Sequence, residues 1–248
     1  SHGVFSVGPK YGCTHHLTLK ELGYNSNNGH QEIVERLENK DIGWAYADQS
    51  MFNPKLHNLM SLRKQIIKRP VITTVEVLVK PVSSKNDMFF TGFVHKPYPP
   101  IYLELSRNAQ FNSATVIRGT EGGIIPSLRQ TGKVHFYHSA GEQDDSYDVT
   151  PDELGIVQSS RAVDIPEEIT RKNTKDKIES KVDAVDIAKE TIKSGISALS
   201  GNDGPMLSCI QLGAAIVLQR ATGDDLDNCS KEVLRVLKSG AALKRMKK

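Results

Sequence analysis

The sequence predicts an α/β protein whose mostly parallel sheet is flanked by helices. Two observations carry this prediction. Short runs rich in β-branched and aromatic residues, such as MFFTGFV and SATVI, are separated by segments with helical spacing of apolar residues. The 248 residues are 38% apolar and 25% charged, which is enough apolar material for a sizeable core.

The first third of the chain predicts two helices and a strand. Thr14 can cap a helix that runs through Leu22 and stops at Gly23. A second helix is expected over His30–Glu38. The run Ile42–Ala47, with the sequence IGWAYA, is typical of a buried strand.

The segment 53–81 predicts a helix with one residue out of place. The helix would open at Pro54, and apolar residues at helical spacing then form a stripe of Leu56, Leu59, Met60, Ile66 and Ile67. Arg63 lies seven residues after Leu56 and therefore on the same stripe. A cation on an apolar face must bind an anion, pair with a carboxylate or extend its head to water. Val71–Val79 fits either a strand or a short helix.

The rest of the chain continues the alternation and ends in helices. Strands are expected over Met88–Val94, Ser113–Ile117 and Lys133–Tyr137, with a helix over Pro100–Ala109. The charged segment 165–182 is expected on the surface. Helices are then expected over 182–199, 205–220 and 225–237, with Gly240 as the last stop.

Composition excludes some classes and favours others. The net charge of +3 is mild, and the basic C-terminal tail is its main concentration. The three cysteines form no metal-binding motif and indicate reduced thiols in the cytoplasm. No apolar run reaches membrane-spanning length, so no membrane partner is expected. The opening residues lack a methionine and are typical of a loop inside a domain, which suggests a fragment.

Small residues and a lysine precede the first expected helix and suggest an anion site. The candidates are His2, Gly3, Lys10, Gly12 and Cys13, whose backbone N–H groups, together with the lysine, can surround a phosphate. The alternative is an ordinary loop. The neighbouring His15 and His16 fit surface or capping positions better than a metal site.

Three further features carry weaker signals. Glu121, in the loop RGTEGG (Arg118–Gly123), is a candidate ligand for Mg²⁺ or a ribose hydroxyl, although a tight turn with an exposed carboxylate is the favoured interpretation. Cys209 and Cys229 lie on expected helices and are read as core residues.

The order of these motifs resembles that of anthranilate phosphoribosyltransferase and its paralogues, the family-three glycosyltransferases. The opening SHGVFSVGPKYGCTHHLTLKELG resembles the family block KHGN…SxKxGSxDxLEALG, and NPKLHNLMSLRKQIIKRPVITTVEVLVKP resembles HPAxKxVxPVRxxLGxRTxFNxLGPL. TGFVHKPY, VIRGTEGG, DVTPDELGI and the closing GPM…LGAAIVLQRATGDDL follow in family order. The resemblance spans nearly the whole chain.

The resemblance implies a fold and a set of domains. It implies an α/β domain over 1–51 and 82–248, and the returning helices of a smaller helical domain over 52–81. The first helices of that small domain and a GTGGD pyrophosphate loop would precede residue 1. It also favours the helical reading of Val71–Val79, and a homodimer.

The resemblance further implies an activity. Family members bind phosphoribosyl pyrophosphate with Mg²⁺ and transfer its ribosyl group to anthranilate, a step of tryptophan biosynthesis. His2, Gly3, Lys10, Gly12 and Cys13 match the phosphate-binding block, with cysteine in place of its serine. Arg63 matches the arginine that meets the aromatic acid, and Arg69 lies in the same block.

The departures from the family pattern open a second reading. Ser1 and Val4 replace a lysine and an asparagine, and Gly123, Ile124 and Ile125 stand in the region of the Asp-Glu pair that holds magnesium. Isoleucine cannot coordinate Mg²⁺, which argues against anthranilate transfer. The chain is therefore either a phosphoribosyltransferase-like protein with a cleft for phosphoribosyl pyrophosphate or another anion, or a non-enzymatic paralogue that binds single-stranded nucleic acid. A third reading is a degenerate fold kept for dimerisation.

Overall fold

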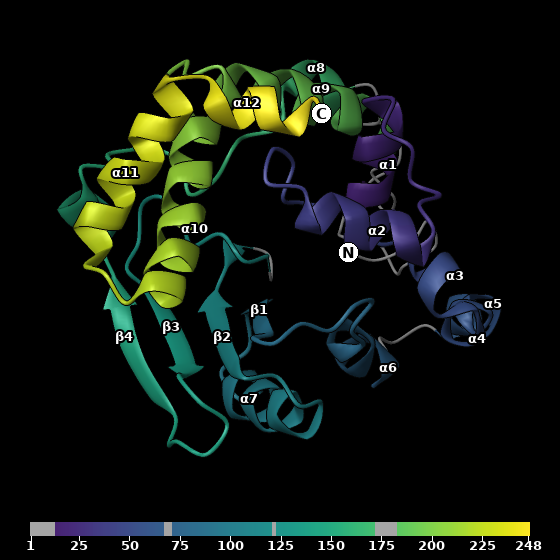
Figure 1. Ribbon diagram of the computed structural model, residues 1–248. Helices are drawn as coiled ribbons and strands as arrows, with labels where there is room; N and C mark the ends of the chain where they lie inside the picture. Colours follow the sequence, from purple (N-terminus) through teal and green to yellow (C-terminus); the bar gives the residue numbers. More distant parts are fainter. Residues whose placement is uncertain (1–12, 67–70, 121–122, 172–182) are drawn as a thin grey trace. The chain divides into compact units, whose positions relative to one another are not determined.

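The computed structural model describes residues 13–66, 71–120, 123–171 and 183–248 in two compact units (Figure 1). The first unit comprises Ser1–Val82, Ile165–Ser194 and Lys248, and the second comprises Ser83–Asp164 and Gly195–Lys247. The units are described separately below. The division expected from the family resemblance, at residues 52 and 81, stays a prediction.

The second unit is built on a four-stranded sheet in the order β1-β2-β3-β4. The strands are β1 (Met88–Phe93), β2 (Ser113–Arg118), β3 (Gly132–Tyr137) and β4 (Asp145–Val149). β1 pairs with β2 in parallel, whereas the β2–β3 and β3–β4 pairs are antiparallel. The α/β class is confirmed.

The sheet is mixed, so the expectation of a mostly parallel sheet was wrong for the described residues. Parallel neighbours need a crossover connection that returns the chain to the same edge. Only the β1–β2 link contains such a helix, α7 (Tyr98–Asn108). The other two links run directly from strand to strand and therefore reverse the direction of the chain. β4 was not expected from the sequence.

Helices cover both faces of this sheet (Figure 1). On one face, the hydroxyl groups of Ser106 in α7 and Tyr137 in β3 lie 3.1 Å apart in a buried contact. On the other face, Ile117 and Val134 pack in one core with Leu212 of α10 (Pro205–Thr222). Alternation along the strands sends successive side chains to these two faces.

The C-terminal helices largely confirm the sequence prediction. They are η3 (Pro151–Leu154), α8 (Glu167–Arg171), α9 (Ala184–Leu199), α10, α11 (Leu226–Lys238) and α12 (Ala241–Met246). Asp225 caps α11 by accepting hydrogen bonds from two backbone N–H groups. Gly240 adopts a left-handed φ of 70°, as a helix stop requires. Cys209 and Cys229 are buried, as predicted.

The first unit includes α8 and the first part of α9, and its described residues before Val82 form only short helices. They are α1 (His15–Glu21), α2 (His30–Glu38), α3 (Gln49–Phe52), α4 (Pro54–His57), α5 (Met60–Gln65), α6 (Ile72–Val75) and η1 (Glu76–Leu78). The first two match the prediction, and Val71–Val79 is helical as the resemblance implied. Over the part of the chain that the structure describes, no helix combines the length and apolar character that spanning a bilayer requires.

The expected strand Ile42–Ala47 is not a strand. A strand requires a partner for its backbone groups, and within the described residues no sheet pairing includes this segment. Its residues are nevertheless partly interior, since Tyr46 is 4% and Ala47 is 7% exposed. Side-chain contacts fix the segment where ladder hydrogen bonds were expected.

Candidate anion-binding site

Two of the predicted site residues, Cys13 and Arg63, fall within the described residues. The others lie outside them and stay predictions; they are His2, Gly3, Lys10, Gly12, Arg69 and Glu121. Both described residues belong to the first unit.

Cys13 lies directly before the first turn of α1. Its Sγ lies 3.6 Å from the hydroxyl of Thr18, and the thiol is partly buried and unoxidised. Thr14 caps the helix by accepting a hydrogen bond of 3.2 Å from the Leu17 N–H group. The capping motif read from the sequence thus positions the end of the predicted phosphate loop.

A buried polar network holds α1 to the segment before α3. Nδ1 of His16 lies 2.9 Å from Oδ2 of Asp48, and the Tyr46 hydroxyl donates to the same oxygen at 3.2 Å. Ser50 donates to the other carboxylate oxygen from both its backbone N–H, at 2.8 Å, and its hydroxyl. His16 and Asp48 are 7% and 2% exposed.

This network corrects one reading of the sequence. The sequence indicates surface or capping positions for His15 and His16, but His16 is a buried partner of a carboxylate. The signal available in the sequence was the pair Asp48 and Ser50, which is typical of a helix cap. Nothing in the sequence showed that the cap would also meet a histidine from α1.

Asp48 is held in its charged form. Burial alone would raise the pKa of Asp48, but hydrogen bonds from the Ser50 hydroxyl and backbone, followed by the charge of His16, hold it below its usual value. Conversely, burial and then the neighbouring Asp48 raise the pKa of the Tyr46 hydroxyl above its usual range. Tyr46 therefore acts only as a neutral hydrogen-bonding group.

Arg63 lies in α5, but the continuous helix predicted around it is broken. α4 ends at His57 and α5 begins at Met60. Because the helix is interrupted, a spacing of seven residues no longer predicts that positions 56 and 63 share a face.

The predicted apolar stripe is also less buried than expected. Met60 is 5% exposed and joins the interior, whereas Leu59 is 41% and Ile66 is 43% exposed. Leu62, which was not assigned to the stripe, is 54% exposed. The predicted stripe is therefore only partly buried, and the role of Arg63 in binding an anion stays a prediction that rests on the resemblance.

In the second unit, the loop after β2 is closed by its own backbone. A side chain at Gly119 would come within 1.5 Å of the Gly123 carbonyl oxygen, so only glycine fits there. Thr120 donates its N–H to the Ile125 carbonyl at 2.9 Å, and Gly123 donates to Thr120 at 3.1 Å. Ile125 packs against the core that contains Leu212.

The packing of Ile125 helps to decide whether this loop can bind Mg²⁺. Its Cγ1 would lie 3.4 Å from a side chain at Gly213, so Ile125 contacts α10. Ile124 is 42% exposed. Neither side chain supplies the oxygen ligands that Mg²⁺ requires. Over residues 13–66, 71–120, 123–171 and 183–248, no cluster of three or more histidine, cysteine, aspartate or glutamate side chains could hold a metal ion.

Comparison with known sequences identifies several relatives, and those that carry a functional name are of one kind. No protein-family model matches the chain. An anthranilate phosphoribosyltransferase of Aquifex aeolicus is 23% identical over 248 residues, which cover 100% of this chain and 65% of the relative. One from Novosphingobium aromaticivorans is 24% identical over 159 residues, covering 64% and 46%. An uncharacterized Aquifex aeolicus protein is 30% identical over 126 residues, covering 51% and 35%.

Solved structures give the same result for the fold. Anthranilate phosphoribosyltransferase from Saccharomyces cerevisiae matches with a TM-score of 0.67 and 16% identity, over 99% of this chain and 61% of that one. A structure of the yeast enzyme in complex with PRPP and Mg matches with a TM-score of 0.68 and 15% identity, over 93% and 60%.

The matches leave part of each relative uncovered. The chain spans between 35% and 65% of the length of these curated relatives. The resemblance that the motifs predicted is confirmed, because the named relatives and structural neighbours of this divergent chain are anthranilate phosphoribosyltransferases and the chain has their α/β fold.

Proposed function

We propose that this chain forms part of a phosphoribosyltransferase-like protein whose cleft binds phosphoribosyl pyrophosphate. The match to the Aquifex aeolicus enzyme over the whole chain is the observation that carries the proposal. The cleft residues are those expected from the motifs. The phosphates are surrounded by His2, Gly3, Lys10, Gly12 and Cys13. The acceptor or another anion is bound by Arg63 and Arg69.

The chemistry of such a cleft is mainly positioning. In ribosyl transfer, the bond between the ribose C1 and pyrophosphate breaks as the acceptor amine bonds to that carbon. The leaving pyrophosphate takes its negative charge with it, so fixed cations and backbone N–H groups are the groups that stabilise the transition state. Lys10 is the cation that the phosphate loop of this chain offers.

The residues present do not fit the magnesium pair of the family. Mg²⁺ would need oxygen ligands and would supply positive charge for the phosphates, but Ile124 and Ile125 occupy the corresponding region, and Ile125 packs against the core. Glu121 is the remaining candidate carboxylate nearby. We infer that the chain binds phosphoribosyl pyrophosphate without the two-carboxylate metal site, and that it does not transfer the ribosyl group to anthranilate.

Calorimetric titration with phosphoribosyl pyrophosphate, with and without Mg²⁺, tests both parts of the proposal. We expect binding in both conditions, with similar affinity. Arg63→Ala should weaken binding about tenfold, as the loss of one charged contact would. Leu62→Ala is the matched control on the same helix, because its exposed side chain should leave binding unchanged.

Two results would contradict the proposal in different ways. Absence of heat and of any thermal shift at millimolar ligand would reject the binding of phosphoribosyl pyrophosphate. Binding that requires Mg²⁺, or measurable anthranilate transfer, would instead show that another residue restores the metal site.

A second candidate function is binding of single-stranded nucleic acid. The specific observation is the C-terminal segment 241–248, AALKRMKK, in which Lys244, Arg245 and Lys247 are exposed and no acidic residue occurs. Lys64 and Lys68 add to the positive charge in the Arg63 block. Rows of cations bind the phosphate backbone without sequence preference and lose affinity steeply with salt.

Gel shifts on single-stranded DNA at rising salt test this second function. We expect binding at low salt that falls steeply with salt and is weakened in the double variant Lys244→Ala/Lys247→Ala. The double variant Lys231→Ala/Lys189→Ala removes the same charge from other helices and is the control. Undetectable binding at low salt, or affinity that salt does not change, would reject nucleic-acid binding.

A further inference from the structure

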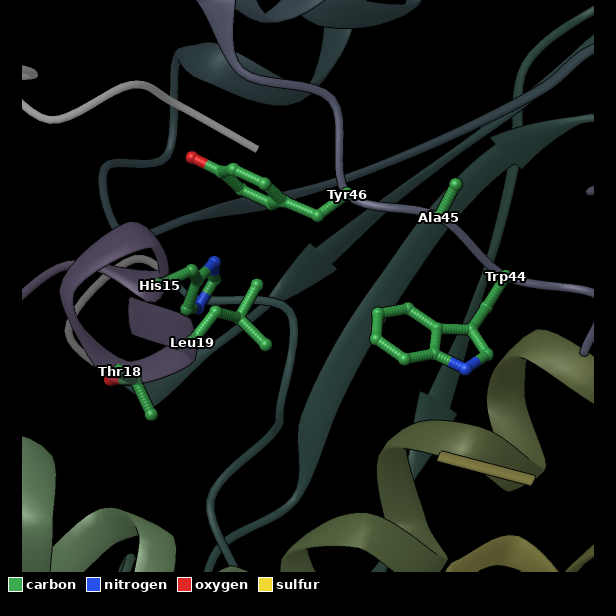
Figure 2. Close-up of a pocket in the computed structure, with 6 residues that line it drawn as sticks. All are labelled: His15, Thr18, Leu19, Trp44, Ala45 and Tyr46. Carbon is green, nitrogen blue, oxygen red and sulfur yellow. The ribbon is translucent and has the colours of Figure 1, made fainter. Parts of the chain in front are cut away.

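The first unit contains a pocket that the proposed function does not use (Figure 2). Its volume is about 310 Å³, and two segments form its walls. α1 contributes His15, Thr18 and Leu19, and the extended segment before α3 contributes Trp44, Ala45 and Tyr46. In Figure 2, Leu19 points across the pocket toward Trp44. None of these six residues belongs to the predicted anion site.

The aromatic walls of the pocket are held in place by neighbours. The Trp44 ring lies 5.1 Å from the Tyr24 ring, and the Arg36 guanidinium lies 5.2 Å from the centre of the indole. The Tyr46 hydroxyl is fixed by Asp48 and His16, at 3.2 and 3.3 Å. These contacts fix the positions of both rings, so binding would require little reordering of either ring.

The lining carries no permanent charge. Among the described residues, the lining contains no lysine, arginine, aspartate or glutamate. Burial lowers the pKa of His15, although the residue keeps an exposed surface, so its imidazole is neutral at pH 7. A charged ligand would lose water here without gaining an opposite charge, which is unfavourable.

The polar groups of the lining are few and complementary to a heteroaromatic ring. A neutral imidazole offers one donor and one acceptor nitrogen. The Thr18 hydroxyl donates to the Thr14 carbonyl at 3.2 Å and also contacts the Cys13 thiol at 3.6 Å, so it adds nothing to the hydrogen bonds that His15 offers. The remaining surface consists of ring faces and aliphatic groups, which pack best against another flat ring.

We propose that this pocket binds a neutral, planar, bicyclic heteroaromatic molecule of the size of a purine base. The volume fits this class, because a cavity of about 150 Å³ holds a single benzene ring and the pocket is roughly twice as large. Pockets of this size with apolar walls and a few converging polar groups are the usual form of small-molecule sites. The ligand stacks on Trp44 and exchanges hydrogen bonds with His15.

Trp44 gives this proposal a direct readout, because it is the only tryptophan of the chain. Adenine is the probe, and sodium benzoate, a flat anion, is the comparison. Titration of the full 248-residue chain with adenine should quench the Trp44 fluorescence to saturation. Benzoate should not, because the pocket offers it no cation. The proposal would be overturned if adenine gave no saturable quenching up to about 10 mM, or if benzoate quenched equally. This adenine concentration lies above the millimolar dissociation constants that correspond to the weakest specific binding.

Two variants locate the binding within the pocket. Ala45→Leu fills the pocket and should weaken adenine binding about tenfold or more, whereas Ala221→Leu, at an exposed position of α10, should not change it. His15→Phe keeps a ring but removes the nitrogens, and should also weaken binding. Circular dichroism checks that each variant is folded. Unchanged adenine affinity in a folded Ala45→Leu chain would overturn the proposal, and if that variant does not fold, unchanged affinity in His15→Phe would do so.

Discussion

The interiors of the two units are filled by different kinds of side chain. In the second unit, Leu212 and Ile216 are fully buried among other apolar residues of the sheet and α10. In the first unit, the buried set includes His16 and Asp48, which pair with each other, and Gln49, whose side chain donates a hydrogen bond to Glu76. The second unit also buries hydrogen-bonded polar groups, such as Ser106 and Tyr137, but among the described residues only the first unit buries a histidine and acidic side chains.

This difference matters because the two kinds of interior respond differently to change. Apolar contacts are non-directional and contribute roughly in proportion to the area buried. A buried polar network contributes only while every member has a partner, since an unpaired buried group costs free energy. Substitutions in the two units should therefore differ in size, in pH dependence and in their readouts.

The largest effect is expected in the apolar core of the second unit. Leu212→Ala removes a side chain that is 0% exposed and leaves a cavity among close-packed residues. We expect the free energy of unfolding to fall by about 2–5 kcal/mol, measured by urea denaturation followed by circular dichroism. Leu37→Ala, at a position that is 42% exposed, is the control. A loss below about 1 kcal/mol for Leu212→Ala would mean that this core is loosely packed.

The next effect concerns the polar network of the first unit. Asp48→Asn removes the charge that faces His16 and changes the groups that Ser50 and Tyr46 meet. We expect a loss of about 1–3 kcal/mol at pH 7. Trp44 fluorescence follows this unit, because the tryptophan lies between Gly43 and Ala45 in the same segment. Asp41→Asn is the exposed control and should change little.

The same variant should also change the dependence of stability on pH. The pKa of Asp48 is lower in the folded chain than in the unfolded one, so the folded state favours the charged carboxylate. Its stabilisation is present above the unfolded pKa of about 3.9 and is lost as pH falls through the folded pKa. The difference between wild type and Asp48→Asn should therefore shrink below about pH 4. A difference that stays constant down to acid pH would show that the charge of Asp48 does not matter.

Much of the second unit could be predicted from the sequence, because its signals are local. α10 and α11 have regular apolar spacing, a proline or aspartate at the start and a glycine at the end. The mixed sheet could not be predicted, because strand direction depends on how connections return the chain. β4 was missed for a related reason, since its sequence DSYDV has little apolar alternation.

The first unit and the candidate site were harder to predict. The contact between His16 and Asp48 joins residues 32 positions apart (48 minus 16), and no local sequence pattern indicates that they meet. The prediction of one continuous helix through Arg63 was wrong, because the spacing of apolar residues does not reveal an interruption. The helix is interrupted at Asn58–Leu59. The pocket beside Trp44 forms between two segments of the chain, and the sequence does not indicate that these segments lie next to each other.

Helix caps should be an exception to the difference between the units, because their effects are local. Thr14 caps α1 and Asp225 caps α11, each through its side-chain oxygen. Thr14→Ala and Asp225→Ala should each cost about 1 kcal/mol, measured by thermal and urea unfolding. Thr14→Ser and Asp225→Ser keep a capping oxygen and should retain most of the stability. A cost of several kcal/mol for one cap alone would show that its side chain has a second role in that unit.

The smallest effect is expected on α5, where the sequence and the structure disagree most about burial. Leu62 is 54% exposed, so Leu62→Ala should change the free energy of unfolding by about 0.5 kcal/mol or less. Met60, on the same helix, is 5% exposed, and Met60→Ala should cost about 2–4 kcal/mol. The pair therefore measures which face of α5 is interior, with helix propensity nearly matched. Equal large costs would mean that Leu62 is covered in solution and that α5 is buried on more than one face.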